Sequence, residues 1–437
     1  MKNYTKKYLD FPRVKKRKIR VNFEGGEVTS DAGSLLLKQA EEKLNLLKKA
    51  SQFFIDERDP SKIRHKILTM LSQRVFGIAL GYEDLNDHTF LRKDTVIQTS
   101  VNQEGLLASS STLCRLEKTA ERNVAVSINK ELVETFIRTQ DKAPDELYLD
   151  FDATDDIVHG KQEGSAYHGY YRNYCFLPLY VFCGSHLLVS YLRQSNQDPA
   201  KHSWAIFALL VKRFREEWPH VNIIFRGDGA FSRHKMFNWI ERKQAHYITG
   251  IGSNNRLKKI IEPWVEKAKM RYEQTSEKQC LFTEFTYAAG TWSRERKIIA
   301  KIEYNDLGSN VRFIVTNING NPQDIYQKIY CARGDMENRI KEQQLSLFSD
   351  RTSSSFWWSN QLRMLFSSLA YVLMNYIRTH ALENTDFKNA QCSTIRLKLF
   401  KIGAVVVKKA YSIFIMISSS YPYQDLFEHV YRKLVPS

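Results

Sequence analysis

The stretch ELYLDFDATDD, residues 146–156, alternates apolar and polar side chains as a β-strand does. Its apolar side chains would lie on one face of the strand, and those of Asp150 and Asp152 on the other. A carboxylate at the end of an apolar strand is costly unless it is paired or binds a metal. The stretch therefore predicts an acidic site at the edge of a buried sheet. Asp152, at the strand end, is the preferred candidate, and Asp150 is its main competitor.

Two further carboxylates stand in comparable positions. Asp228 follows the apolar run in VNIIFRGDG, residues 221–229, and Glu337 lies in the helix-like YCARGDMENRIKE, residues 330–342. Two aspartates on strands and a glutamate on a helix can hold a pair of Mg²⁺ ions, which is the apparatus for in-line attack on a phosphodiester. We therefore predict Asp152, Asp228 and Glu337 as both metal ligands and catalytic residues.

The composition describes a folded, strongly basic protein. The 437 residues are 43% hydrophobic, which predicts a folded chain of about two or three domains. The formal net charge is +17, from 65 Lys and Arg against 48 Asp and Glu. Such an excess indicates a polyanionic partner, because Lys and Arg gain affinity by releasing counterions from phosphates.

Cysteine usage and hydropathy bear on the compartment. The six cysteines are scattered and form no C-x-x-C pair, which suits a reducing cytoplasm and argues against a zinc site. The chain shows no apolar segment at its N-terminus typical of a secretory signal. Its longest apolar stretches are far too short to span a bilayer, so we expect no membrane association.

The N-terminal third is predicted to be basic and then helical. Residues 1–22 form a basic arm that would lie along a DNA backbone or in a minor groove, unless it is simply solvated. Apolar spacings of three and four then indicate helices up to about Pro144. SSSTLCRLEKTAERN can be read as the end of a helix-turn-helix, with Arg115 and Lys118 facing DNA, or as plain bundle packing.

From Glu146 the predicted order of elements is β-β-β-α-β-α-β, which is that of an RNase H-like domain. The fold class is therefore α/β: an RNase H-like catalytic domain interrupted by a β-rich insertion, with an all-α N-terminal region. The predicted boundaries are 1–22 for the basic arm, 23–144 for a helical DNA-binding region, 145–261 for the first part of the catalytic domain, 262–325 for the insertion, 326–390 for the second catalytic part, and 391–437 for a basic, strand-like C-terminal region.

On these residues the chain resembles the DDE transposases of bacterial insertion sequences, in the group described as transposase DDE domain group 1. The specific signature is Tyr-x-x-Arg-x-x-x-Glu, present as Tyr330, Arg333 and Glu337. Asp152 matches the first family aspartate in the form Asp-x-Thr, and Asp228 matches the second. Blocks such as SDAGSLLL, GYEDLNDH, VHGKQEG and GIGSNNRL extend the resemblance over nearly the whole chain.

The resemblance implies a cut-and-paste DNA transposase that depends on Mg²⁺, for which Mn²⁺ can substitute. Its partners would be double-stranded DNA, both inverted-repeat ends and target, and it would act as a homodimer on DNA because two ends must be held together. The expected place is the bacterial cytoplasm, at the nucleoid. The alternatives are a metal-dependent nuclease or resolvase of the same fold, and a catalytically inactive DNA-binding relative.

Further residues are candidates for contact with DNA around the carboxylates. Arg333 can grip a phosphate bidentately, and Tyr330 can bond a phosphate, stack on a base, or simply pack at the start of a helix. The wider family often has a lysine seven residues beyond the glutamate, but here that position is Gln344. Lys341 shares the helix face with Glu337 and is the candidate replacement.

Three more candidates lie elsewhere in the chain. His159 and Gln162 follow the first strand and would touch DNA near the scissile bond, although His159 is also readable as an ordinary loop histidine. The resemblance further implies an aromatic residue of the insertion that holds a flipped base, and Trp292, near two arginines, is the candidate.

Overall fold

The computed structural model describes residues 8–435, so Lys2, Lys6 and Lys7 of the predicted basic arm lie outside the described residues. The chain forms two compact units. The first comprises Met1–Asn45, Arg58–Cys114 and Tyr376–Ser437, and the second comprises Leu46–Glu57 and Arg115–Asn375. Among the helices that the structure describes, none combines the length and the apolar character that crossing a bilayer requires.

An eight-stranded mixed sheet organises the second unit, in the order β12-β13-β14-β11-β10-β4-β8-β9. Its strands are β4 (Glu146–Ala153), β8 (Leu179–Cys183), β9 (His186–Tyr191), β10 (Asn222–Gly227), β11 (His246–Ile251), β12 (Gln279–Tyr287), β13 (Arg296–Asn305) and β14 (Gly308–Thr316). The strand β4 is antiparallel to β8 and parallel to β10, which is in turn parallel to β11. This arrangement, with β9 antiparallel to β8, confirms the predicted RNase H-like order.

The segment between β11 and the helix that bears Glu337 continues this sheet. It begins with the helix α10 (Asn255–Thr275), inside which the predicted insertion boundary at residue 262 falls. The strands β12, β13 and β14 follow as an antiparallel meander, and β14 pairs with β11. The three strands therefore extend the edge of the eight-stranded sheet.

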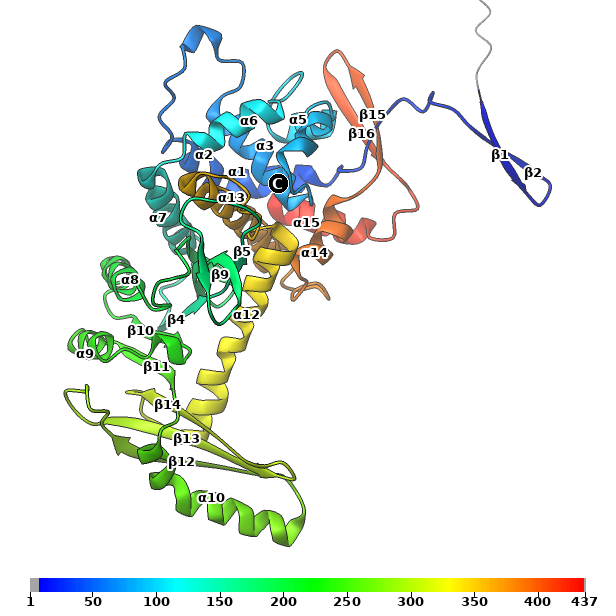
Figure 1. Ribbon diagram of the computed structural model, residues 1–437. Coiled ribbons are helices and arrows are strands. Elements are labelled where there is room, and N and C mark those ends of the chain that lie inside the picture. The colour runs from blue at the N-terminus through cyan, green and yellow to red at the C-terminus, as the bar shows by residue number, and fades with distance from the viewer. Residues whose placement is uncertain (1–7, 436–437) are drawn as a thin grey trace, which may run out of the picture. The chain divides into compact units, whose positions relative to one another are not determined.

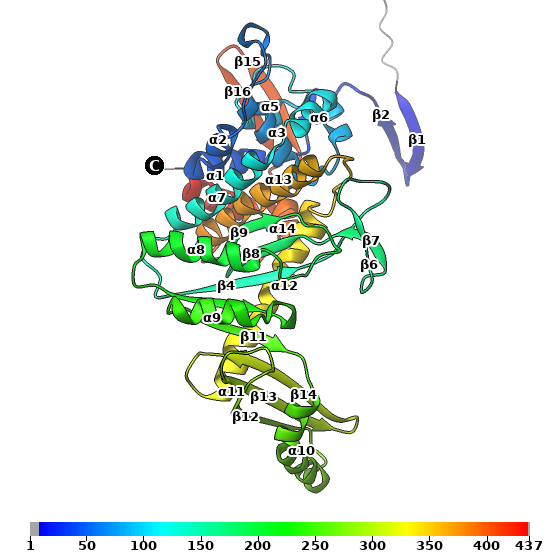
Figure 2. The same cartoon turned by 60° about the vertical axis from the view of Figure 1, so that its left-hand side comes forward.

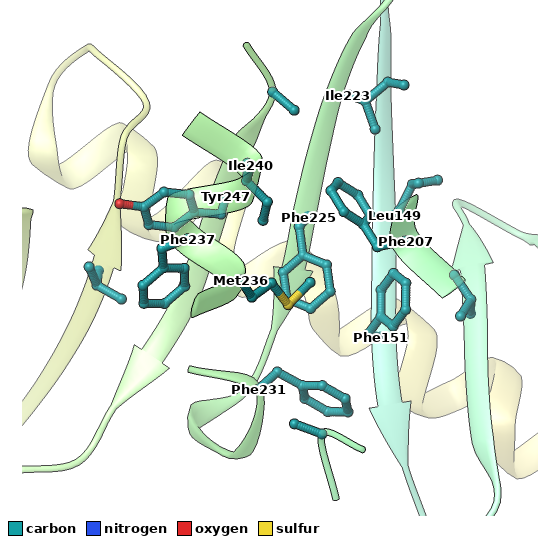
Figure 3. Close-up of a cluster of buried hydrophobic side chains, with 14 of the residues drawn as sticks. Leu149, Phe151, Phe207, Ile223, Phe225, Phe231, Met236, Phe237, Ile240 and Tyr247 are labelled. Atoms are coloured by element: carbon teal, nitrogen blue, oxygen red, sulfur yellow. The ribbon is translucent and has the colours of Figure 1, made fainter. Parts of the chain in front are cut away.

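One face of the sheet is covered by four helices: α7 (Arg122–Arg138), α8 (Ser203–Glu217), α9 (His234–Arg242) and α10. Figure 2 shows α8 and α9 in front of the sheet strands, with α12 behind them. Alternate residues of β4 and β10 point into this layer, where Phe151 and Phe225 pack with their ring centroids 4.6 Å apart (Figure 3). Burial of such aromatic side chains dominates the energetics of a core.

A continuous helical run from Pro322 to Ser346 covers the opposite face at β10, β11 and β14 (Figure 1). It consists of α11 (Pro322–Asp324), a π-helical turn (Ile325–Tyr330), a 3₁₀ turn (Cys331–Arg333), α12 (Gly334–Lys341) and a second π-helical turn (Glu342–Ser346). The long apolar pattern of residues 356–382 predicts a buried helix, and that helix is present as α13 (Trp357–Tyr376). The hydroxyl of Tyr371 on α13 donates to the carbonyl oxygen of Ser185 between β8 and β9, at 2.8 Å.

A small sheet in the order β5-β7-β6 stands beside the main one. It contains β5 (Asp156–Ile157), β6 (Ala166–His168) and β7 (Asn173–Phe176). The apolar run NYCFLPLYVFCG, residues 173–184, predicts a single strand, but Pro178 separates β7 from β8. Proline has no N–H to donate to a ladder, so the chain can change sheets at this point.

The first unit combines short helices with two small sheets. Its helices are α1 (Ser34–Leu44), α3 (Ile67–Ala79), α4 (His88–Leu91), α5 (Thr95–Ser100), α14 (Cys392–Ile395) and α15 (Gln424–Leu434); α2 (Leu46–Ser51) belongs to the second unit, and α6 (Ser110–Lys118) crosses the boundary. One sheet has the order β16-β15-β3, from β3 (Glu27–Thr29), β15 (Ala404–Lys409) and β16 (Ser412–Ile417). Gly33 lets the N- and C-terminal segments meet, since a Cβ there would lie 1.7 Å from the carbonyl oxygen of Leu399.

Two segments of this unit differ from expectation. Residues 8–21 of the basic arm form an exposed hairpin of β1 (Leu9–Val14) and β2 (Arg17–Val21), and with β3 they show that strands as well as helices build the N-terminal region. Residues 393–400, expected to be strand-like, are helical. The guanidinium of Arg396 there donates to the carbonyl oxygens of Ile78 and Ala79, which satisfies the C-terminal end of α3.

Candidate active site

Asp152 lies at the C-terminal end of β4, on the face away from the aromatic core. Leu149 and Phe151 point into that core, so the strand period of two places Asp150 and Asp152 together on the other face. One carboxylate oxygen of Asp152 accepts a hydrogen bond from the Ala153 N–H at 2.9 Å. Its side chain retains 15% of its exposure, so it remains accessible to a ligand.

Asp228 follows the last residue of β10, the parallel neighbour of β4. Because parallel strands end at the same edge of a sheet, Asp152 and Asp228 are brought to one side of it. The Asp228 carboxylate accepts a hydrogen bond from the Ala230 N–H at 2.9 Å and so caps the 3₁₀ turn Gly229–Phe231. This cap orients the side chain at the sheet edge.

Glu337 reaches the same place from α12. Arg333, one helical turn earlier, donates from Nη1 to Asp152 at 3.1 Å and from Nη2 to Glu337 at 3.0 Å. A single guanidinium thus joins the first carboxylate of the sheet to the carboxylate of the helix. The structure therefore brings Asp152, Arg333 and Glu337 into direct contact, with Asp228 near enough to influence the charge state of Asp152.

The electrostatics of this cluster follow from burial among like charges. Burial raises the pKa of Asp152 to about 6, Arg333 opposes the rise, and the charges of Asp228 and Glu337 add to it. Burial lowers the pKa of Arg333, but the surrounding anionic groups outweigh that effect and the net pKa is raised. An additional cation would therefore be stabilised beside Asp152.

The donor set has the chemistry that a hard divalent cation requires, since all three groups are carboxylates. Within residues 8–435, however, no three His, Cys, Asp or Glu side chains are grouped so that they hold a metal ion as they stand. Arg333 lies between Asp152 and Glu337 and neutralises part of their charge. The residues fit a divalent ion by chemistry, and closing them around one would require Arg333 to turn away.

The remaining residues of the signature helix lie around this cluster. Tyr330 is half-buried beside the sheet, with its ring 5.5 Å from that of Tyr326, and burial raises its pKa. Lys341 is exposed on α12. Gln344, at the position of the family lysine, donates from its amide to the carbonyl oxygen of Asp155 at 3.0 Å. The Gln344 side chain thus ties the helix to the end of β4.

The two predicted DNA contacts His159 and Gln162 follow β4 in the chain and lie in the loop between β5 and β6. His159 is exposed, whereas Gln162 accepts a hydrogen bond from the amide of Asn360 at 3.4 Å. The same loop is held near the start of α13, where Glu163 accepts a hydrogen bond from the Trp357 N–H at 2.9 Å. Their contact with DNA stays a prediction.

Trp292 is placed differently from the other candidates. Its ring packs edge-on against Phe237 and Tyr287, at 6.1 and 5.8 Å, and carries the Arg296 guanidinium at 5.3 Å. These contacts belong to the core on the face of the sheet opposite Tyr330. The structure therefore does not group Trp292 with the signature residues, and its proposed stacking on a base stays a prediction.

The sequence offered Asp150 as the competitor of Asp152 but did not predict its pairing with Arg226. Asp150 and Arg226 form a buried ion pair directly beneath the cluster, with Nη2 of Arg226 2.7 Å from the Asp150 carboxylate. The available indication was an arginine two residues before Asp228 in an otherwise apolar strand, VNIIFRGDG. A buried guanidinium in such a run requires an acidic partner on the neighbouring strand.

An RNase H-like sheet with acidic residues at adjacent strand ends, faced by a glutamate on a helix, defines the class of nucleic-acid enzymes with carboxylate sites. Residues 11–437 match the family described as Transposase DDE domain group 1, and the chain belongs to that family. It is thus a DNA transposase of the DDE class, an enzyme family that generally uses divalent metal ions.

Comparison with other proteins adds two findings. A search of curated proteins finds no match. Among solved structures, the chain is similar to the piggyBac transposase in a synaptic complex with hairpin DNA, with a TM-score of 0.41 and 11% sequence identity over 94% of this chain and 86% of that chain.

Proposed function

We propose that this transposase works by cut-and-paste. It binds the terminal inverted repeats of its element, cleaves the element ends and joins their 3′-OH groups to target DNA. The observation that supports this chemistry is the meeting of Asp152 and Glu337 on one guanidinium, with Asp228 on the adjacent strand end. Such activity requires access to chromosomal DNA, so we propose the bacterial cytoplasm, at the nucleoid, as the place of action.

Asp152, Asp228 and Glu337 would hold Mg²⁺, or Mn²⁺ in its place. Ions held there would supply activation of the water or 3′-OH nucleophile and stabilisation of the leaving oxygen. The burial of Asp152 favours this role, because a low-dielectric site strengthens each electrostatic interaction made there. The raised pKa of Asp152 means that cation binding and loss of its proton are coupled.

Arg333 would exchange its two carboxylates for a phosphate of the DNA. Its planar fork can bond two phosphate oxygens at once, and the phosphate brings the negative charge that Asp152 and Glu337 now supply. Tyr330 and Lys341 lie on the same helical run and would contact the adjacent backbone. His159 and Gln162 would approach it from the loop between β5 and β6.

The remaining DNA contacts would come from basic surfaces away from the carboxylates. The exposed hairpin of β1 and β2 presents Arg13, Lys15, Lys16, Arg17, Lys18 and Arg20 to solvent. These side chains suit a phosphate backbone rather than base edges. Because two element ends must be cut and joined together, we propose that the active form is a homodimer on DNA.

A strand-transfer assay tests the proposal. The substrate is a duplex with the inverted repeat that flanks the coding region, cut so that its 3′-OH is exposed, incubated with supercoiled plasmid and Mg²⁺. A transposase joins the duplex to the plasmid. Hydrolysis of DNA without joining would instead indicate a nuclease or resolvase of the same fold, and binding of the duplex with neither joining nor hydrolysis would indicate an inactive relative.

A further inference from the structure

The buried pair of Asp150 and Arg226 lies where three site-bearing elements meet. Asp150 on β4 and Arg226 on β10 are direct partners in the parallel ladder. Nη2 of Arg226 lies 2.7 Å from one carboxylate oxygen of Asp150, and Nε donates to the other. The third nitrogen, Nη1, donates to the carbonyl oxygen of Ile329 at 2.6 Å. The guanidinium of Arg226 on β10 therefore forms hydrogen bonds with both β4 and the helical run.

Each element continues from this contact to a predicted ligand. Asp150 precedes Asp152 by two residues on the same face of β4, and Arg226 precedes Asp228 by two residues. Ile329 lies two turns before Glu337 in the helical run and directly before Tyr330. Any slip of one element relative to another would therefore change the distances among all three carboxylates.

Net stability is a poor explanation for this pair. Asp150 and Arg226 are 2% and 7% exposed, so both charges have lost nearly all their water. Desolvation of two charges can exceed their mutual attraction, and apolar replacements of such pairs are often neutral or stabilising. The hydrogen bonds of the pair are better explained by alignment of these elements. Nε and Nη2 of Arg226 bond Asp150 on β4, and Nη1 bonds Ile329 in the helical run.

We propose that Asp150 and Arg226 are positioning residues that fix the register of β4, β10 and the signature helix, and so set the spacing of Asp152, Asp228 and Glu337 for metal binding. This inference rests on the proposed function of those three carboxylates. It assigns no contact with the metal or the DNA to the pair itself. The centroid of the Tyr148 ring lies 5.3 Å from the guanidinium carbon of Arg226, so the ring covers the guanidinium.

Two variants separate positioning from folding. The double variant Asp150→Leu/Arg226→Met removes both charges and leaves no buried ion unpaired, so the unit should still fold. Arg226→Lys keeps the charge beside Asp150 but cannot reach Asp150 twice and Ile329 once with the same geometry. The matched control is Glu134→Leu/Arg213→Met, which removes a bidentate pair that joins α7 to α8 at 2.6 and 2.8 Å and lies in the same unit.

The readouts are Mn²⁺ binding to the full chain by electron paramagnetic resonance, the midpoint of thermal unfolding, and Mg²⁺-dependent cleavage of the end duplex. We expect both variants of the Asp150–Arg226 pair, here called the clamp variants, to bind Mn²⁺ roughly tenfold or more weakly than the wild type, because the loss of groups that orient metal ligands typically has that effect. Their unfolding midpoints should lie within about 3 °C of the wild type. The control should bind Mn²⁺ and cleave as the wild type does.

Wild-type Mn²⁺ affinity and cleavage in Arg226→Lys would overturn the positioning role, whether or not the double variant folds. Equal losses in the clamp and control variants would also overturn it, since they would reflect general loosening of the unit. A wild-type chain that neither binds Mn²⁺ nor cleaves DNA would instead refute the proposed function, and this inference with it.

Discussion

The hydroxyl of Tyr330 lies against the Cα of Gly250 at the end of β11. A Cβ added at Gly250 would lie 2.9 Å from the Tyr330 oxygen and 2.9 Å from the backbone nitrogen of Gly229, the residue after Asp228. The absence of a side chain at this position therefore lets the signature helix approach the strand end that carries the second aspartate. A cavity of about 300 Å³ opens beside this contact, lined by Gly252, Arg312 and Tyr326 among others.

Gly250→Ala should impair the site more than the fold. The added methyl group would displace either Tyr330 or the turn after Asp228, and a displacement of this kind costs roughly tenfold to a hundredfold in rate. Cleavage of the end duplex under single-turnover conditions measures the loss. Gly252→Ala is the matched control, because nothing lies within 4 Å of a Cβ there. Equal rates for the two variants would contradict this account of the contact.

Asp152→Ala, Asp228→Ala and Glu337→Ala should each abolish cleavage and joining. Each variant removes a proposed metal ligand. Metal ions stabilise the charge of the transition state by several kcal/mol, so we expect the rate of cleavage to fall about 100-fold or more. Binding of the end duplex, measured by gel mobility shift, should change little. Asp335→Asn, on the exposed part of the same helix, serves as the control. Full activity in any one alanine variant would remove that residue from the catalytic set.

Arg333→Gln should separate metal binding from DNA cleavage. The variant removes the cation that now pairs with Asp152 and Glu337, so Mn²⁺ should bind at least as tightly as it does to the wild type. Cleavage should nevertheless fall by about tenfold or more, because the bidentate phosphate contact is lost. Mn²⁺ titration and a cleavage assay on the same preparation test both halves. A variant with weaker Mn²⁺ binding would show that Arg333 organises the carboxylates instead of competing for them.

The first unit should lose stability in mild acid through His88. Burial lowers the pKa of this histidine to about 3, and the charge of Arg74 contributes. The unfolded chain takes up the proton near its ordinary pKa, so the contribution is complete above pH 6.5 and is lost as the pH falls toward 3. At pH 5 the free energy of unfolding is therefore lower by about 2 kcal/mol than at neutral pH.

His88→Gln should flatten that dependence. Glutamine can still accept the hydrogen bond that the Gln73 amide donates to Nδ1 of His88 at 3.1 Å, but it does not titrate. Chemical denaturation at pH 7 and pH 5 gives the free energy of unfolding for each protein. The exposed His159→Gln is the control and should keep the wild-type difference between the two pH values. An unchanged difference in His88→Gln would mean that other groups cause the acid loss.

Neutralising the hairpin should weaken DNA binding without weakening the fold. The triple variant Lys15→Gln/Lys16→Gln/Lys18→Gln changes only exposed side chains. If each lysine contacts one phosphate, the slope of log affinity against log salt should fall by about 0.9 per contact. The effect is measured as the affinity for the end duplex at several salt concentrations between about 50 and 200 mM. An unchanged slope would place the DNA elsewhere.

The predicted site residues that the structure places near one another share a property: each belongs to a local sequence pattern. Asp152 and Asp228 end strands whose apolar periods are readable in isolation, and Glu337 lies in a short signature on one helix. The sheet order followed from the sequence of strands and helices. The two aspartate positions and the sheet order depend on the backbone period, and Glu337 depends on the short signature that carries the family resemblance, so none of them requires knowledge of distant partners.

The misplaced parts depend on contacts between distant segments. Residues 393–400 alternate as a strand would, yet Arg396 reaches carbonyl oxygens more than 300 residues earlier in the chain, and the segment is helical. Pro178 divides one apolar run between two sheets, since each half finds its own partner strand. Arg226 is informative only once Asp150 is known to lie opposite it. Such pairings cannot be read from propensity alone.

The strand meander after α10 has a practical consequence. Its final strand, β14, leads within a few residues into the helical run that bears Glu337, while the turn between β13 and β14 lies at the opposite end of these long strands. Leu307 in that turn is 90% exposed. An affinity tag or fluorescent reporter grafted between Asp306 and Leu307 would therefore be attached to the eight-stranded sheet itself, at the end of β13 and β14 away from the helical run that bears Glu337.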